Sequence, residues 1–438
     1  RRHRHGPDLE GVVGMTVTAE PTRALQQVRL TPAEKRQRIL GGVYFALAVF
    51  VLVFFALDPD SAQDATFNLS LANARFSLSW TFEPRLIAII VAISLAVIGV
   101  LQLTVGFGRW TNMVLGGAMA LFVLAFLGWA TAGQAFSLVG MLASMVVLSV
   151  PITCGGLTGL VGERVGIVNI GIEGQLLTAA FVGTIVGSSF GSWIGIVGAM
   201  ASGALLGAVL AVLVIKYQVD QIIAGVVINI FALGLTSFLA TRVLGPNPQF
   251  NSPDRLTTIS IPILEDIPVI GAMFFQGNVF LYGSLLLVAF LHYALFYTRW
   301  GLRSRSVGEH PKAADTVGID VYRTRYRNLT LAGLIAGFGG AALTLGSTGR
   351  FEENMTAGIG YIGLAAMIAG RWRPFGVLGA ALVFGFARSM QQKLGILGTP
   401  IPSEFLAMAP YVLTIIVVAG LVGRARAPAA DGQPYVRD

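Results

Sequence analysis

The sequence predicts an all-α, polytopic membrane protein, and three observations support this prediction. Of the 438 residues, 55% are hydrophobic and only 12% are charged, whereas soluble domains carry roughly 25% charged residues. Apolar runs of span length recur along the chain. Glycines recur at four-residue spacing, as in Gly203 with Gly207 and Gly333 with Gly337, which is typical of closely packed membrane helices. We therefore expect about 10–12 transmembrane helices of roughly 20 residues.

The composition argues against several other classes of protein. The net charge of +8 is spread among apolar runs, so nucleic acid is not an expected partner. The single cysteine, Cys154, excludes an internal disulfide and is expected to pack as a small apolar side chain. The four histidines show no metal-ligand spacing, and we predict neither a metal site nor a catalytic residue. No lysine follows a glycine, so the chain lacks the phosphate-binding loop of an ATPase.

The apolar runs place the expected spans in order. The fifth and tenth are the least regular, and we expect a short broken or re-entrant helix among them. The expected spans are residues 40–57, 85–105, 112–130, 136–154, 170–190, 193–215, 221–241, 278–298, 328–346, 358–370, 375–393 and 404–423.

The distribution of Lys and Arg predicts the orientation. With the N-terminus inside, the inner segments hold 23 basic residues and the outer segments hold 6, as the positive-inside rule requires. Both termini are therefore expected in the cytoplasm, as a basic N-terminal region of residues 1–39 and a tail of residues 424–438. A short helix from Thr31 is expected to lead in along the membrane surface.

The segments on the outer side contain no recognisable catalytic or binding motif. Residues 40–84 are expected to hold an extra first span followed by a β-hairpin around residues 72–74, because apolar and polar residues alternate there. The alternating apolar residues are Phe67, Leu69, Leu71, Phe76, Leu78 and Trp80. The second long outer loop, residues 242–277, contains five prolines and is expected to be irregular.

Residues 162–175, with the sequence GERVGIVNIGIEGQ, place polar side chains where a membrane span should begin. Irregular, glycine-rich chain at membrane depth is tolerated only when it is buried in protein or lines a wet cavity. A second glycine-punctuated segment, AGIGYIGLAAMIAG at residues 357–370, belongs to a span of opposite orientation. Paired segments of this kind occur near the binding sites of transporters with inverted repeats. The sequence therefore indicates a possible inverted repeat, against the alternative that the two segments are similar only in composition.

Four polar residues are candidates for the solute pathway. Asn169 and Glu173 would share one helix face, with Gln175 nearby and Asn229 inside the seventh span. The alternative is that these side chains tie a broken helix to its neighbours. Topology places Glu163 and Arg164 at the inner surface, as a pair or in contact with a partner.

The long inner loop, residues 299–327, is larger than a reversal of chain direction requires. Pro311 is suited to a first helical turn and Gly318 to a C-terminal cap, so we expect a short helix with a small apolar face formed by Ala313, Ala314 and Val317. Asp320 can then cap the next helix. The loop therefore predicts a docking element for a cytoplasmic partner.

The motif at residues 162–174 and the sequence VGEHPKAADTVGI at residues 307–319 resemble those of permease subunits of bacterial ABC importers. The nucleoside importers, within the branched-chain amino acid and ribose permease family, are the most similar group. The resemblance covers residues 85–423 and implies a type II importer-like transmembrane domain in the inner membrane. It implies a coupling helix in a cleft of the ATPase, formed by Gly308, Glu309, Pro311, Ala313, Ala314 and Gly318.

The resemblance also implies the partners. They are cytoplasmic ATP-binding subunits that hold ATP and Mg, a second permease chain, an extracytoplasmic solute-binding protein and the surrounding lipid, with no cofactor on this chain. The implied function is alternating-access transport of a nucleoside. Branched-chain amino acids or a pentose are alternatives, and so is an ion-coupled secondary transporter, although acids at mid-span are few beyond Glu173.

Overall fold

The structure is a computed structural model that describes residues 31–70, 78–398, 402, 404–408, 411–412 and 426–437. The expected hairpin turn at residues 72–74 and most of the expected span at 404–423 lie outside these residues. Eight of the described helices are long and apolar enough to cross a membrane, which confirms the prediction of an all-α, polytopic membrane protein. The helices are α1 (Pro32–Phe50), α2 (Pro84–Thr104), α3 (Thr111–Ala130), α4 (Leu138–Glu163), α5 (Ile172–Phe190), α6 (Ser192–Ala211), α7 (Gln221–Leu239), α8 (Val279–Tyr297), α9 (Arg299–Glu309), α10 (Pro311–Thr316), α11 (Val321–Leu343), α12 (Ile359–Ala369) and α13 (Pro374–Leu397).

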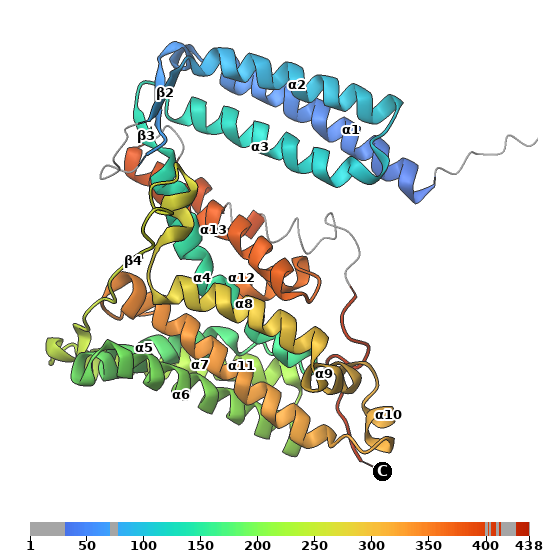
Figure 1. Cartoon of the computed structure of the whole chain (residues 1–438), viewed down its shortest axis with the longest axis vertical. Coiled ribbons are helices and arrows are strands. Elements are labelled where there is room, and N and C mark those ends of the chain that lie inside the picture. Colours follow the sequence, from blue (N-terminus) through green and yellow to red (C-terminus); the bar gives the residue numbers. More distant parts are fainter. Residues whose placement is uncertain are drawn as a thin grey trace, which may run out of the picture.

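Helices α1, α2 and α3 form a group of their own, set beside the other helices (Figure 1). Their shared core contains Tyr44, Leu95 and Ala118, all fully buried. Helix α1 begins at a capping box, in which Thr31 and Glu34 bind each other's backbone N–H groups. The helix then runs on into the membrane segment without a break, so the expectation of a separate surface helix at Thr31 is wrong.

A small sheet joins this group to the rest of the chain. Strand β1 (Ala65–Asn68) pairs antiparallel with β2 (Ser79–Phe82), as the alternation of apolar residues predicts. Strand β3 (Ala135–Ser137), just before α4, adds to β1 in parallel and was not predicted. In the second outer loop only β4 (Ile259–Ser260) and β5 (Gln276–Gly277) pair, and the rest is irregular chain with short 3-10 and π-helical segments.

Helices α6 and α11 pack through their glycines. A methyl group on Gly203 would lie against the backbone of Gly333 and Gly337, and one on Gly207 would lie against Gly333. Only glycine allows two helix backbones to approach this closely. The predicted role of the four-residue spacing is confirmed at this interface, and Cys154 is fully buried, as predicted.

Two boundaries differ from the sequence prediction. Helix α4 continues to Glu163, well beyond the expected end at residue 154, because its glycines pack on α12, where Gly156 contacts Gly363. Residues Arg299–Glu309, expected as loop, form helix α9, which begins at a cap from Thr298 to the N–H of Gly301.

Candidate functional site

The end of α4 is anchored by Trp372, which follows α12 in the chain. The Trp372 indole N–H donates to the Glu163 carboxylate at 2.6 Å, and the Arg164 guanidinium donates to the Trp372 carbonyl. Glu163 and Arg164 therefore bind Trp372 instead of pairing with each other, which corrects the expected inner-surface pair. Burial, followed by the nearby charge of Arg305, lowers the pKa of Arg164 from its ordinary value.

Between α4 and α5 the chain is non-helical. Gly166 has a φ of +77°, which breaks the helix at little cost because glycine has no Cβ. The Gln221 side chain then accepts from the N–H of Val168 at 2.7 Å. Farther along, the Asn169 amide donates to the Gln175 side-chain oxygen at 3.2 Å, and both residues are fully buried.

Glu173 lies in the first turn of α5 and reaches the N-terminus of α12. Its two carboxylate oxygens accept from the N–H of Gly358 at 2.8 Å and of Gly360 at 2.6 Å. The first N–H groups of a helix lack intrahelical partners and carry the positive end of the helix dipole. One negative charge therefore stabilises two helix starts, those of α5 and α12.

Asn229 of α7 joins the same region. Its oxygen accepts from the N–H of Gly174 at 2.8 Å, and its nitrogen donates to the Ile170 carbonyl at 2.9 Å and to the Tyr361 hydroxyl at 3.0 Å. The structure thus brings all four predicted pathway residues to the start of α5. Their bonds are of the kind that the structural-tie alternative predicts, and pathway lining by these residues remains a prediction.

Two contacts define the relative direction of α5 and α12. Trp372, after α12, binds Glu163 and Arg164 before α5. Phe351, before α12, packs edge-on against Phe181 within α5, with ring centroids 5.1 Å apart. The two short segments therefore run in opposite directions and meet at their N-termini near Glu173, which is the arrangement expected of an inverted pair.

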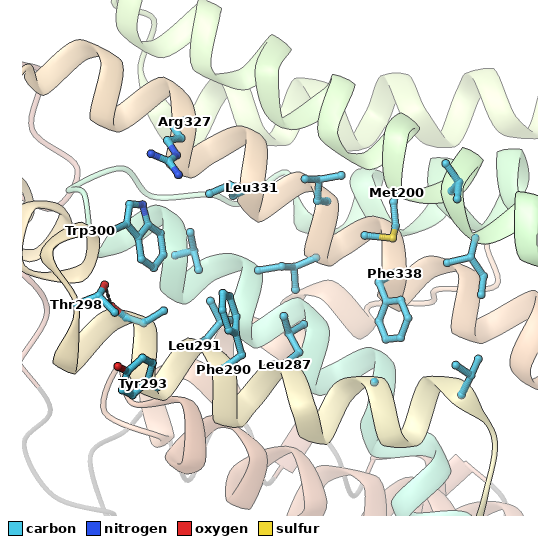
Figure 2. Close-up of a pocket in the computed structure, with 18 of the residues that line it drawn as sticks. Met200, Leu287, Phe290, Leu291, Tyr293, Thr298, Trp300, Arg327, Leu331 and Phe338 are labelled. Carbon is cyan, nitrogen blue, oxygen red and sulfur yellow. Dashed lines mark hydrogen bonds between the residues drawn. The ribbon is translucent and has the colours of Figure 1, made fainter. Parts of the chain in front are cut away.

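A separate groove of about 760 Å³ lies among α4, α6, α8 and α11 (Figure 2). Leu287, Leu291 and Phe338 are among the apolar side chains that form most of its wall. Figure 2 shows Arg327 and Trp300 together at one end. A groove this apolar offers few partners for a polar solute, so the polar cluster at α5 is the better candidate for the pathway.

The short helix predicted in the inner loop is present as α10, with Pro311 in its first turn and Gly318 at φ +83° just beyond its end, and its docking role remains a prediction. Asp320 caps α11 as expected, accepting from the N–H of Arg323 at 2.9 Å. The predicted apolar face is wrong, however. Ala314 is buried against the chain's own core, whereas Ala313 and Val317 are exposed.

Two sets of contacts at helix N-termini were missed by sequence reasoning. His310 caps α10 by accepting from the N–H of Ala313 at 3.2 Å, and the glycines at 358 and 360 hold Glu173 through their backbone. The sequence did contain a signal for the Glu173 contact. Two glycines two residues apart lie at the start of α12, a helix with no side-chain cap of its own.

The family model for the permease component of the branched-chain amino acid transport system matches residues 141–419. The chain belongs to this family. The match begins inside α4, so α1, α2 and α3 of this permease precede the matched region. It is therefore a multi-pass membrane permease, a pore-forming component.

Curated relatives extend the comparison. The permease is 40% identical over 306 residues to the guanosine ABC transporter permease protein NupQ of Bacillus subtilis, covering 67% of this chain and 95% of the relative. It is 40% identical over 309 residues to the nucleoside ABC transporter permease protein NupC of Lactococcus lactis, covering 68% and 96%. It is 30% identical over 327 residues to a putative glucose ABC transporter permease protein, TsgC13, of Haloferax volcanii, covering 68% and 98%. No solved structure matches the chain.

Proposed function

We propose that this permease forms the membrane pathway of an ATP-driven importer of nucleosides. The observation that carries this proposal is the 40% identity to NupQ and NupC, across almost the full length of both relatives. Guanosine is therefore the first solute to test. The putative glucose permease is a more distant relative, and a sugar is the second.

Helix α10 is the proposed contact for a cytoplasmic ATPase that holds ATP and Mg. It is a short helix between two longer ones, capped at its start by His310 and followed by a left-handed glycine. Its exposed surface includes Lys312, Ala313 and Thr316, with Val317 exposed just beyond its end. A rigid, capped helix of this kind can transmit a displacement from a partner into α11 without itself unwinding.

The remaining partners and the orientation are also proposals. Figure 1 draws the start of α1, helices α9 and α10 and the C-terminus on one side of the molecule, in keeping with both termini in the cytoplasm of a bacterial cell. A second permease chain would complete the pathway, and an extracytoplasmic binding protein would deliver the solute.

Within the pathway, Asn169, Glu173, Gln175 and Asn229 are the proposed contacts for a nucleoside. The Asn169 oxygen and the Gln175 nitrogen are buried and have no hydrogen-bond partner among the described residues. Such unsatisfied groups are uncommon in folded proteins. Hydroxyls and ring nitrogens of a nucleoside would match them when the two helix starts part.

The solute assignment is tested with proteoliposomes that contain the permease, its ATPase and its binding protein. ATP-dependent uptake of labelled guanosine, ribose and leucine is measured side by side. We expect guanosine to accumulate. Uptake of leucine alone would contradict the nucleoside assignment, and uptake driven by a proton gradient without the ATPase would contradict the importer itself.

The docking assignment is tested by co-purification of the ATPase with Ala313→Asp. We expect the ATPase no longer to co-purify, because the new charge lies on the exposed face of α10 that the partner would cover. The permease itself is expected to keep its thermal stability. Gln249→Asp adds the same charge to an exposed position in the second outer loop and serves as the matched control. Retention of the ATPase by Ala313→Asp would contradict α10 as the docking element.

A further inference from the structure

Residues 426–437, here named the C-terminal strap, fold back onto α10 and its neighbours. The N–H of Ala430 donates to the Gly308 carbonyl at 2.9 Å, and the N–H of Ala429 donates to the Glu309 carboxylate at 3.2 Å. On the other side, a methyl group on Gly166 would come within 2.9 Å of the Ala430 carbonyl. The strap is thus wedged between α9 and the chain that leads to α5.

Tyr435 is the apolar anchor of the strap, with only 6% of its surface exposed. Its cluster contains Ala314 of α10 and Val165, which lies between α4 and α5. The Tyr322 ring lies 5.4 Å from the Tyr435 ring, centroid to centroid, and the Arg325 guanidinium lies over the same ring at 5.9 Å. The Tyr435 ring therefore contacts the start of α11 and belongs to one buried cluster with α10 and the chain that leads to the proposed pathway.

Polar contacts hold the strap at its C-terminal end and at its middle. Arg437 makes an ion pair with Asp315 of α10, with Nε 3.2 Å from Oδ2, and its N–H donates to the Tyr322 hydroxyl at 3.2 Å. In the middle of the strap, the Asp431 carboxyl lies close enough to that of Glu163 for the two to share a proton, and it lies near the Arg325 charge. Two carboxyls can share a hydrogen bond only when one of them carries a proton.

We propose that the C-terminal strap positions α10 and joins it to residues 163–169, so that a displacement of α10 by the ATPase reaches the pathway. Tyr435 and Arg437 are positioning residues in this scheme. Neither is expected to contact the solute or the nucleotide. The proposal rests on the proposed function, because it assumes that α10 is the docking element.

The packing of the strap between α9 and the α4–α5 connection explains how a displacement of α10 would reach the pathway. Ala314 faces inward, onto Val165 and Tyr435, so α10 bears on the α4–α5 connection partly through the strap. Packed interiors transmit displacement because they are dense and have few voids. Without the Tyr435 ring, α10 could move while Val165 and the start of α5 stayed in place.

The test uses the complete importer in proteoliposomes and measures guanosine uptake per ATP hydrolysed. Tyr435→Ala is expected to keep the ATPase bound and to lower this ratio severalfold. Tyr435→Phe keeps the ring and is expected to restore the ratio. Val436→Ala, at a neighbouring exposed position, is the matched control and is expected to leave it unchanged. A ratio in Tyr435→Ala equal to that of the wild type would overturn the proposal.

Milder and locked variants cover the case in which Tyr435→Ala fails to assemble. Arg437→Ala removes only the exposed ion pair and is expected to lower the ratio by a smaller factor; an unchanged ratio would contradict the strap. The pair Asp315→Cys and Arg437→Cys is joined with a bifunctional thiol reagent, with the native Cys154 buried, and is expected to retain uptake because strap and helix move together. Loss of uptake on cross-linking would show that the strap must leave α10.

These outcomes separate the two proposals. A wild-type chain that binds no ATPase, or moves no guanosine with one bound, would defeat the proposed function. If the wild type takes up guanosine and the strap variants show the same ratio of guanosine uptake to ATP hydrolysed, the proposed role of the strap fails while the proposed function stands.

Discussion

Glu173→Gln tests whether one carboxylate holds two helix starts together. The glutamine keeps one acceptor for the N–H groups of Gly358 and Gly360 but presents an NH₂ group to the other. Loss of one hydrogen bond to a charged group costs about 1.5–3 kcal/mol. Loss of the charge at two helix N-termini adds about 0.3–1 kcal/mol for each. The expected destabilisation is therefore about 2–5 kcal/mol.

The assay is thermal unfolding of the detergent-purified permease, followed by guanosine uptake in proteoliposomes. Glu353→Gln makes the same chemical change at an exposed carboxylate shortly before α12 and is the matched control. We expect the unfolding temperature to fall for Glu173→Gln and to stay the same for Glu353→Gln. Equal unfolding temperatures for the two variants would refute the claim that Glu173 stabilises the start of α12.

Three further predictions follow from single contacts. Gly337→Ala places a methyl group against the backbone of α6 and should lower the free energy of unfolding by about 1–3 kcal/mol through overpacking, seen as a lower unfolding temperature. Gly379 has open space around it, so Gly379→Ala should leave the unfolding temperature unchanged. Asn229→Ala leaves two buried backbone groups unpaired at about 1–3 kcal/mol each, and an unfolding temperature equal to that of the wild type would contradict the tie. Burial raises the pKa of Asp431 from 3.8 to about 6, against the opposing effects of Glu163 and Arg325. The docked strap therefore binds the Asp431 proton more tightly than the undocked strap does. Docking should weaken as the pH rises from 3.8 to about 6, because the undocked strap loses this proton first. Quenching by acrylamide of a fluorophore on Val436→Cys, an exposed position of the strap, should follow this change, and Asp431→Asn should remove it.

The sequence was sufficient for the helices whose signal is local. Apolar runs predicted the spans, and Pro311, Gly318 and Asp320 correctly marked the limits of α10 and the start of α11, because caps and turns depend on residues a few positions apart. The same holds for the strands on either side of the hairpin turn. Helix α9 was missed because its arginines and serines show no span-length apolar run.

The candidate site depended on contacts between residues far apart in the chain. The sequence indicated that Glu173 and Asn229 were unusual, but not that Gly358, Gly360 and Tyr361 were their partners. Trp372 and the strap were missed for the same reason. Ala314 shows the limit most clearly: a six-residue helix gives too few positions to decide which face turns inward, and Tyr435, more than a hundred residues away, decides it.

The meeting of α5 and α12 at their N-termini has a mechanical consequence. A helix bent in the middle must break i→i−4 hydrogen bonds, whereas the first N–H groups of a helix have no such bond and are held by other partners. At Glu173 two such turns face each other, joined by the two carboxylate contacts and by the bond from Asn229 to Tyr361 of α12. Because side chains join the two helices here, the angle between them can change without breaking the i→i−4 hydrogen bonds inside either helix.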